Sequence, residues 1–192
     1  QKILPVIMDG VGFSTTGIGD AVGDAHTPTL DELLAFTPTA SLKAHGSAVG
    51  LPSDDDMGNS EVGHNALGCG QIYSQGAKLV NESIESGKIF ASESWAQVVS
   101  ACKDNGSLHF IGLLSDGNVH SNIAHLISMI TQAKKDGVKS VKAHVLLDGR
   151  DVPATSALTY VDMLEKAMAE LNDGTFNAEI ASGGGRMKVT MD

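Results

Sequence analysis

The sequence has few aromatic residues, only two cysteines and no long hydrophobic run. Aromatic residues make up 4% of the chain, so its core must be built from aliphatic side chains and methionine. The two cysteines, Cys69 and Cys102, are too few for a disulfide framework and fit a reducing compartment. No stretch approaches the roughly 18 apolar residues of a membrane span, and no signal-peptide pattern opens the sequence. The cytoplasm is therefore the expected location.

The chain is also poor in positive charge. Its net charge is −10 at pH 7, which argues against nucleic acid or an anionic membrane as a main partner. Only two residues are arginine, Arg150 and Arg186. Glycine is abundant, with 22 of 192 residues, which indicates tight turns or places where the backbone approaches a ligand closely. The expected partner is a small molecule.

The first 75 residues contain two short strand patterns and two helix starts. Residues 3–8 form an apolar run typical of a buried parallel strand, and residues 40–44 predict a second short strand. Thr27 and Pro28 predict the N-cap and first residue of a helix that ends near residue 36. Another helix is expected to begin near Ser60 and to end at the glycines that follow.

From residue 76 onward, strand and helix patterns alternate. We expect strands at 108–114, 141–147 and 178–181, and helices at 78–86, 92–104, 122–135 and 155–171. A βαβαβ order predicts an α/β fold with a parallel sheet, right-handed crossovers and helices on both faces. A domain boundary is expected between two segments, residues 1–75 and residues 76–192.

Polar loops follow the three strands of this second segment. In open parallel sheets, ligands bind beyond the carboxyl ends of the strands. Arg150 and Arg186 are therefore predicted at one sheet edge, where a guanidinium group suits contact with phosphate or carboxylate. His120, in the first loop beside Asp116, is a further candidate. The alternative is that each arginine pairs with a neighbouring carboxylate as ordinary loop structure.

Asp9 and Ser60 form a second candidate site. Asp9 directly follows the first predicted strand, a common place for a carboxylate metal ligand. At a helix start, Ser60 would lie beside N–H groups and a partial positive charge that stabilise a phosphoryl group. A divalent cation could activate the hydroxyl. The same position suits a simple helix N-cap, and His64, one turn later, suits either a base or a packing residue.

Several motifs resemble those of one enzyme family. Around Ser60, residues 56–65 read DMGNSEVGHN. Residues 113–121 read LLSDGNVHS, residues 148–151 read DGRD, and residues 180–187 read IASGGGRM. In this order along the chain, the motifs resemble the N-terminal portion of cofactor-independent phosphoglycerate mutases, in the form of the plant and trypanosomatid branch.

The resemblance implies a specific domain arrangement and specific roles for the site residues. It implies part of a phosphatase-like domain of the alkaline phosphatase superfamily, followed by an inserted transferase domain. Asp9 would be a metal ligand, and Ser60 would be both a metal ligand and the catalytic phosphoryl acceptor. The residues that would hold the substrate are His120, Arg150, Asp151 and Arg186.

The resemblance also implies a reaction. Family members interconvert 3-phosphoglycerate and 2-phosphoglycerate in glycolysis and gluconeogenesis, through a phosphoserine and without 2,3-bisphosphoglycerate. They use two divalent metal ions, for which manganese is the first expectation and magnesium or cobalt the others. Most metal ligands would lie outside these 192 residues, and the full-length protein is expected to be a monomer. Asn118 stands where the family usually has glycine, which removes no functional group.

Two alternatives remain from different classes. One is another phosphatase of the same superfamily, or a phosphopentomutase, which would share the logic of Asp9 and Ser60. The other is a non-catalytic remnant that binds phosphoglycerate. The loops that carry His120 and Arg150 favour the mutase.

Residues 1–192 alone are expected to be inactive, and the sequence is interpreted as a fragment. One carboxylate and one serine cannot hold two metal ions. A coupled assay with 3-phosphoglycerate and manganese would measure this. Detectable turnover by the isolated 192-residue chain would contradict the expectation.

Overall fold

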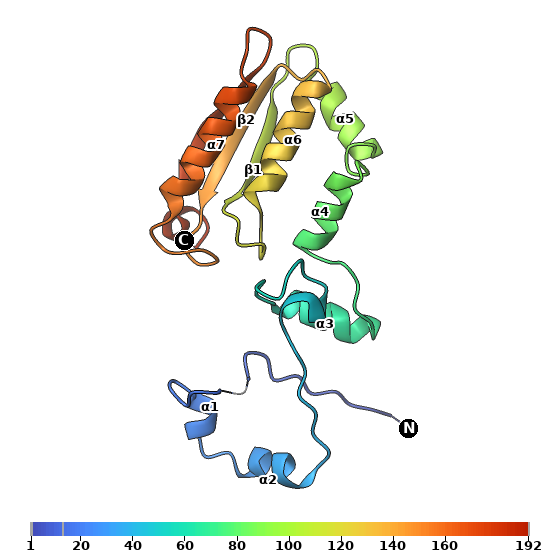
Figure 1. Ribbon diagram of the computed structural model, residues 1–192, viewed down its shortest axis with the longest axis vertical. Coiled ribbons are helices and arrows are strands. Elements are labelled where there is room, and N and C mark those ends of the chain that lie inside the picture. The colour runs from blue at the N-terminus through green and yellow to red at the C-terminus, as the bar shows by residue number, and fades with distance from the viewer. Residues whose placement is uncertain (1, 13, 192) are drawn as a thin grey trace. The chain divides into compact units, whose positions relative to one another are not determined.

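The computed structural model describes residues 2–12 and 14–191 (Figure 1). The chain divides into two compact units, one within residues 1–43 and one within residues 44–192. Among the described residues, no helix is both long enough and apolar enough to cross a bilayer.

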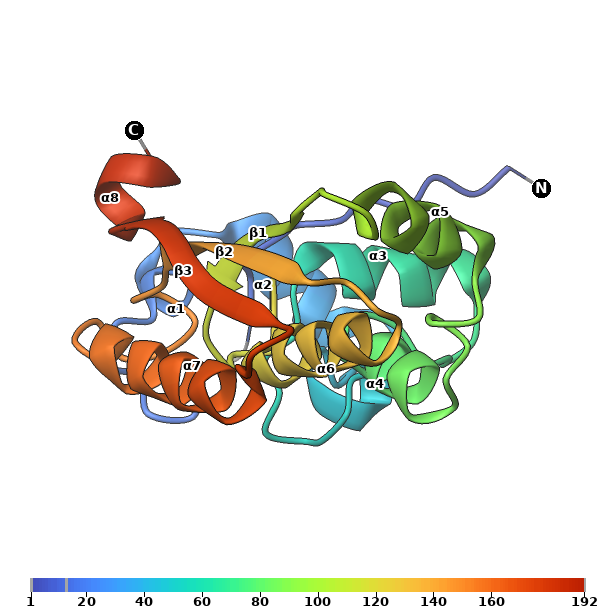
Figure 2. The same cartoon turned by 90° about the horizontal axis from the view of Figure 1, so that it is seen from above.

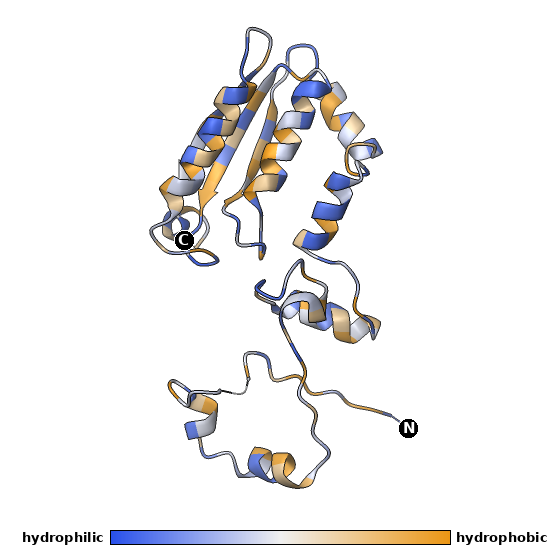
Figure 3. Ribbon diagram, viewed as in Figure 1, coloured by the Kyte–Doolittle hydropathy of each residue, from blue (hydrophilic) through white to orange (hydrophobic). Residues whose placement is uncertain are grey.

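The first unit contains the helices α1 (Ala21–Asp24) and α2 (Pro28–Phe36). Thr27 is the N-cap of α2 and Pro28 its first residue, as predicted. The predicted strands at 3–8 and 40–44 do not form. A strand needs a neighbour for its backbone hydrogen bonds, and no described segment pairs with either. Figure 3 colours this part of the ribbon largely as hydrophobic. Its apolar residues are consequently exposed, Ile3 by 88%.

The second unit is built on a parallel sheet. Its strands are β1 (Leu108–Leu114), β2 (Ser140–Leu147) and β3 (Asn177–Gly184), in the order β1-β2-β3. The predicted α/β fold with parallel βαβ units is confirmed. The third strand is longer than the predicted 178–181, because its Gly184 pairs with Leu146 at the carboxyl end of β2.

The helices of the second unit lie before, between and after these strands in the sequence. They are the 3-10 helix η1 (Gly46–Val49), α3 (Ser60–Cys69), α4 (Ala77–Glu85), α5 (Glu93–Cys102), α6 (Ile123–Lys135), α7 (Ala157–Leu171) and α8 (Arg186–Val189). The short elements η1 and α8 were not predicted, since four residues carry no detectable periodicity. The other five were predicted to within a few residues.

One face of the sheet packs against α6 and α7 (Figure 2). The core contains Val141 of β2, Ile130 of α6 and Leu164 of α7, none more than 1% exposed. Helices on both faces were predicted, but among the described residues the second face is largely exposed. The strand order does not reverse, so both crossovers place their helices on the same side.

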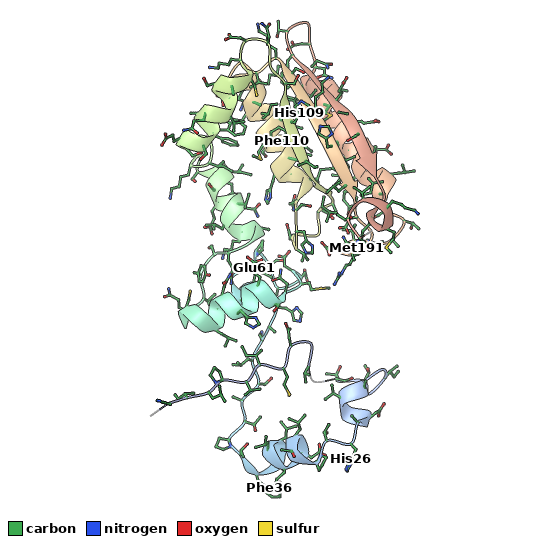
Figure 4. All side chains as sticks on the ribbon, turned by 180° about the vertical axis from the view of Figure 1, so that it is seen from behind. His26, Phe36, Glu61, His109, Phe110 and Met191 are labelled. Atoms are coloured by element: carbon green, nitrogen blue, oxygen red, sulfur yellow. The ribbon has the colours of Figure 1, made fainter. Side chains whose placement is uncertain are left out.

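The opposite face carries a row of polar side chains. His109 Nδ1 lies 2.9 Å from His144 Nε2, and His144 Nδ1 lies 2.7 Å from Ser182 Oγ. His109 is labelled in Figure 4 beside Phe110, whose side chain packs against the core instead. Neighbours along a strand point to opposite faces, which separates these two residues.

The segment between residues 44 and 75 has a small core of its own. It is made by the buried side chains of Val49, Leu51 and Val62. The buried Gln75 donates from Nε2 to the carbonyl oxygens of Val49, at 2.6 Å, and Val62, at 3.0 Å. These bonds hold η1 against α3.

Leu164→Ala should lower the free energy of unfolding by about 3 kcal/mol, because it leaves a cavity at a fully buried position. Leu158→Ala, on the same helix but 73% exposed, is the matched control and should cost about 0.5 kcal/mol or less. Urea unfolding followed by circular dichroism measures both. Equal costs for the two variants would contradict the packing described for α7.

Candidate active site

Three polar loops meet at the carboxyl edge of the sheet. Ser115 follows β1, Asp148 follows β2, and Arg186 begins α8 directly after β3. The strands are parallel and in register at this edge, where Leu114 pairs with Leu147. The sequence-based prediction that both arginines lie at one sheet edge is therefore confirmed.

Asp148 is the centre of this edge. Its side chain is 1% exposed and accepts hydrogen bonds from every loop of the site. Oδ1 accepts the backbone N–H groups of Gly149 at 2.8 Å, Arg150 at 3.0 Å and Asp151 at 3.2 Å, and an N–H of the Arg186 guanidinium at 3.4 Å. Oδ2 accepts the hydroxyl of Ser115 at 2.8 Å. One buried carboxylate thus holds the loop of Arg150 to the other two strands.

The hydrogen bonds also fix the charge of Asp148. Burial alone would raise the pKa of this carboxyl group. The backbone N–H of Arg150, the hydroxyl of Ser115 and two further N–H groups outweigh burial and hold the pKa below its usual value. Asp148 is therefore an anion at neutral pH, opposite the guanidinium of Arg186.

His120 is oriented by Asp151. Its Nδ1 lies 2.7 Å from Asp151 Oδ2, and the histidine side chain is 56% exposed while the aspartate side chain is 6% exposed. Since an ionised carboxylate only accepts, Nδ1 carries the proton in this contact. Gly117 permits the close approach of the two loops, because a Cβ there would lie 2.7 Å from Cβ of Asp151.

The two arginines differ in their surroundings. The side chain of Arg186 is only 16% exposed and forms an ion pair with Asp148. The alternative that the arginines pair with neighbouring carboxylates therefore holds for Arg186. Arg150 is exposed, and no ion pair of its side chain occurs within the described residues. Its guanidinium group is available to an anionic ligand.

Tyr160 of α7 supports the first loop. Its hydroxyl donates to Asp116 Oδ1 at 2.6 Å. This hydrogen bond, together with burial and the negative charges of Asp116 and Asp148, raises the pKa of Tyr160 to about 12. The phenol therefore stays protonated and keeps the loop that carries His120 in place.

Ser60 is the first residue of α3, and its side chain is exposed. The N-cap of this helix is Asn59, whose side chain accepts the backbone N–H of Val62 at 3.0 Å. The alternative that Ser60 serves as the N-cap is therefore wrong. Glu61, labelled in Figure 4, follows it in the first turn. The side chain that caps α3 is therefore that of Asn59.

His64 lies beside Ser60 but is unsuited to be its base. Its Nδ1 is 2.7 Å from the backbone oxygen of Ser60 and 3.2 Å from the hydroxyl oxygen. A carbonyl oxygen only accepts, so Nδ1 donates in the shorter contact and has no lone pair for the serine proton. Of the two interpretations of His64, this geometry favours the structural one.

Asp9 lies in a turn after the extended segment of the first unit. The two predicted metal ligands, Asp9 and Ser60, offer carboxylate and hydroxyl oxygens, the donors that suit manganese or magnesium. No group of three or more His, Cys, Asp or Glu residues suited to a metal occurs in the described part of the chain. The donor types fit a divalent cation, and the set is too small to enclose one.

Sequence reasoning missed the residues that support the site. For Asp148 a local signal does exist, because an Asp at a strand end, before glycine, often accepts the next backbone N–H groups. The contacts of Ser115 and Tyr160 cross from one element to another. No local pattern in the sequence signals such contacts.

The fold and site define a class of protein, an α/β protein whose parallel sheet brings both arginines to its carboxyl edge. Similarity to known sequences and structures identifies the family. The family sequence model described as "BPG-independent PGAM N-terminus" matches residues 80–192, and the chain belongs to this family, the 2,3-bisphosphoglycerate-independent phosphoglycerate mutases.

Individual relatives agree with this assignment. Over its whole length the chain has 51% sequence identity to the Leptospira interrogans protein named "Probable 2,3-bisphosphoglycerate-independent phosphoglycerate mutase". The aligned segment makes up 36% of that protein. Its sequence identity to the Trypanosoma brucei brucei 2,3-bisphosphoglycerate-independent phosphoglycerate mutase is 48%, over the whole of this chain and 35% of that protein. A crystal structure of Leishmania mexicana phosphoglycerate mutase at low cobalt concentration matches with a TM-score of 0.85 and 48% identity, over 97% of this chain and 34% of that one. The chain thus spans about a third of the length of these relatives.

Asp148→Asn should lower the free energy of unfolding at pH 6 by about 2 kcal/mol, because it removes the charge from several hydrogen bonds. The folded-state pKa of Asp148 is lowered, so its stabilisation is present above the unfolded pKa near 4 and is lost as pH falls through the folded value. The difference between wild type and variant should therefore shrink between pH 6 and pH 3.

Urea unfolding at several pH values measures this difference. Asp162→Asn, at an exposed position of α7, is the matched control and should change stability by about 0.5 kcal/mol or less. A cost of Asp148→Asn that does not vary with pH would contradict the ionised state assigned to Asp148.

Proposed function

We propose that the protein carrying this chain is a metal-dependent phosphoglycerate mutase that interconverts 3-phosphoglycerate and 2-phosphoglycerate without 2,3-bisphosphoglycerate. The observation that carries this proposal is the preorganised edge of the sheet. There Asp148 holds the loops of Arg150 and Arg186 together, in a member of this mutase family. A substrate with a phosphate and a carboxylate offers two anionic groups to this edge.

Substrate binding falls to the residues of the three loops. Arg150 offers an exposed guanidinium fork, which suits bidentate contact with a phosphate or carboxylate. Asp151 holds the proton of His120 at Nδ1, so Nε2 remains for the substrate. When the His120 ring is neutral, Nε2 accepts a hydrogen bond from a glycerate hydroxyl. When the ring is protonated, Nε2 donates a hydrogen bond to an anionic oxygen.

Ser60 acts as the phosphoryl acceptor. Its Oγ gives up its proton and bonds to phosphorus, while the bond from phosphorus to the glycerate oxygen breaks and that oxygen takes a proton. The glycerate reorients, and its other hydroxyl loses a proton and attacks the same phosphorus. The bond to Ser60 then breaks, and Oγ takes a proton back. The N-terminus of α3 provides partial positive charge beside the phosphoserine.

Asp9 and Ser60 would contribute oxygen ligands to divalent cations, with further ligands from the rest of the protein. A bound cation would lower the pKa of the serine hydroxyl, a role that His64 cannot take because its Nδ1 donates to a carbonyl. The Leishmania mexicana relative was crystallised with cobalt. We propose manganese here, with magnesium or cobalt as alternatives.

The proposed domain boundary between residues 75 and 76 has local support. Gln75 bonds back to Val49 and Val62, whereas α4, which begins at Ala77, packs against α6. The match of the family model also begins close by, at residue 80.

A monomeric state and a cytoplasmic location complete the proposal. The cytoplasm is proposed because a glycolytic enzyme would act there.

Ser60→Ala in the full-length protein should reduce mutase activity by at least about a thousandfold, because the phosphoryl acceptor is lost. Ser100→Ala, at an exposed position of α5, is the matched control and should retain full activity. An assay coupled to consumption of 2-phosphoglycerate, with manganese present, measures both. Full activity of Ser60→Ala would refute the proposed role.

A further inference from the structure

A row of side-chain amides joins the loop of His120 to the loop before Ser60. Asn122 donates from Nδ2 to Asn118 Oδ1 at 2.7 Å, and Asn118 donates from Nδ2 to Asp56 Oδ1 at 2.7 Å. Oδ2 of Asp56 accepts the backbone N–H of Ser53 at 2.7 Å and the hydroxyl of Ser53 at 2.8 Å. The row of hydrogen bonds therefore runs without a gap from the start of α6 into the loop before Ser60.

Each group in this row has a fixed direction. A flip of the Asn118 amide would turn its oxygen toward the Asp56 carboxylate and its NH2 group toward the NH2 group of Asn122. The donor to the carboxylate is thus set by the neighbours on both sides. Hydrogen bonds to an ionised acceptor are also stronger than neutral ones. Burial would raise the pKa of Asp56, but the hydrogen bonds from Asn118 and Ser53 lower it overall, so the acceptor is ionised at neutral pH.

The backbone of Asn118 shows what its side chain adds. Its φ of 59° is the one positive value among the described non-glycine residues. Glycine adopts this conformation most readily, and asparagine tolerates it better than most other residues. A glycine here would keep the turn but could not reach Asp56. The side chain is therefore the feature that distinguishes this position from a simple turn.

Both ends of the row are held by their own elements. The Asn122 side chain accepts the backbone N–H of Ala124 at 2.8 Å and so caps α6. The backbone oxygen of Asp56 accepts the N–H of Gly46 at 3.0 Å. Two residues later, a Cβ on Gly58 would lie 2.0 Å from the carbonyl oxygen of Ala44, so this segment cannot shift easily. A bond between two anchored ends fixes the distance between them.

We propose that Asn118 is a positioning residue that holds the Ser60 segment at a set distance from the substrate loop of His120. It acts through the two loops, by way of Asp56. The inference rests on the proposed function, because the separation matters only if the phosphoryl group passes between a substrate held by one loop and an acceptor on the other. A misplacement of about 1 Å at such a step can cost about a hundredfold in rate.

Asn118→Gly in the full-length protein tests this role, since it keeps the turn and removes only the donor. We expect kcat to fall about tenfold with KM little changed, and the amides of residues 53–59 to exchange hydrogen about tenfold faster. Asn105→Gly, at an exposed loop position, is the matched control and should change neither quantity. Unchanged exchange in the three strands confirms that the fold is intact.

A charge exchange tests the direction of the bond. Asn118→Asp places a second carboxylate against Asp56 and should lower kcat further than Asn118→Gly. Adding Asp56→Asn should restore kcat to within about threefold of wild type, because the amide at position 56 can donate to the new carboxylate and accept from Ser53. A merely structural effect of the single changes would not be reversed by combining them.

Three results would overturn the inference while Ser60→Ala remains inactive. They are an unchanged kcat in Asn118→Gly, an Asn118→Asp variant no worse than Asn118→Gly, and a double variant with no recovery. Full activity of Ser60→Ala would instead refute the proposed function itself. The two failures are therefore distinguishable.

Discussion

The buried carboxylate of Asp148 is the constraint on which the candidate site depends. It accepts three consecutive backbone N–H groups, the hydroxyl of Ser115 and an N–H of Arg186, which come from the ends of all three strands. An ionised group with so little exposure is stable only when its oxygens are hydrogen-bonded, as they are here. The arrangement aims Arg150 outward and places Asp151 against His120. The loops at this edge are thus preorganised by their own hydrogen bonds.

Anchored polar contacts of the same kind connect this edge to the segment that contains Ser60. Gln75 holds α3 against η1, and the bond between Asn118 and Asp56 joins that segment to the loop after β1. Both connections end in groups that are fixed by further hydrogen bonds. The proposed phosphoryl transfer needs positioning more than new covalent chemistry, and rigid links between the proposed acceptor and substrate loops would serve that need.

Local pattern was sufficient for the second half of the fold. The apolar run 108–114 and the amphipathic period of 122–135 predicted β1 and α6 closely, because strand and helix periods are local properties. The run 3–8 misled for the same reason, since its sequence resembles a buried strand but no described segment pairs with it. For the site, the βαβ order predicted that Arg150 and Arg186 share an edge. The central role of Asp148 could not be read from it.

The sequence by itself determined the order of the strands and longer helices from residue 76 onward, the edge of the sheet where polar loops gather, and the family to which its motifs point. Tertiary structure decided which face of the sheet the helices cover, that Asn59 and not Ser60 caps α3, and that Asn118 reaches Asp56. The physical reason is the range of the interactions. Periodicity and turn preference act over a few residues, whereas a hydrogen bond between residues 62 positions apart exists only once the chain has folded.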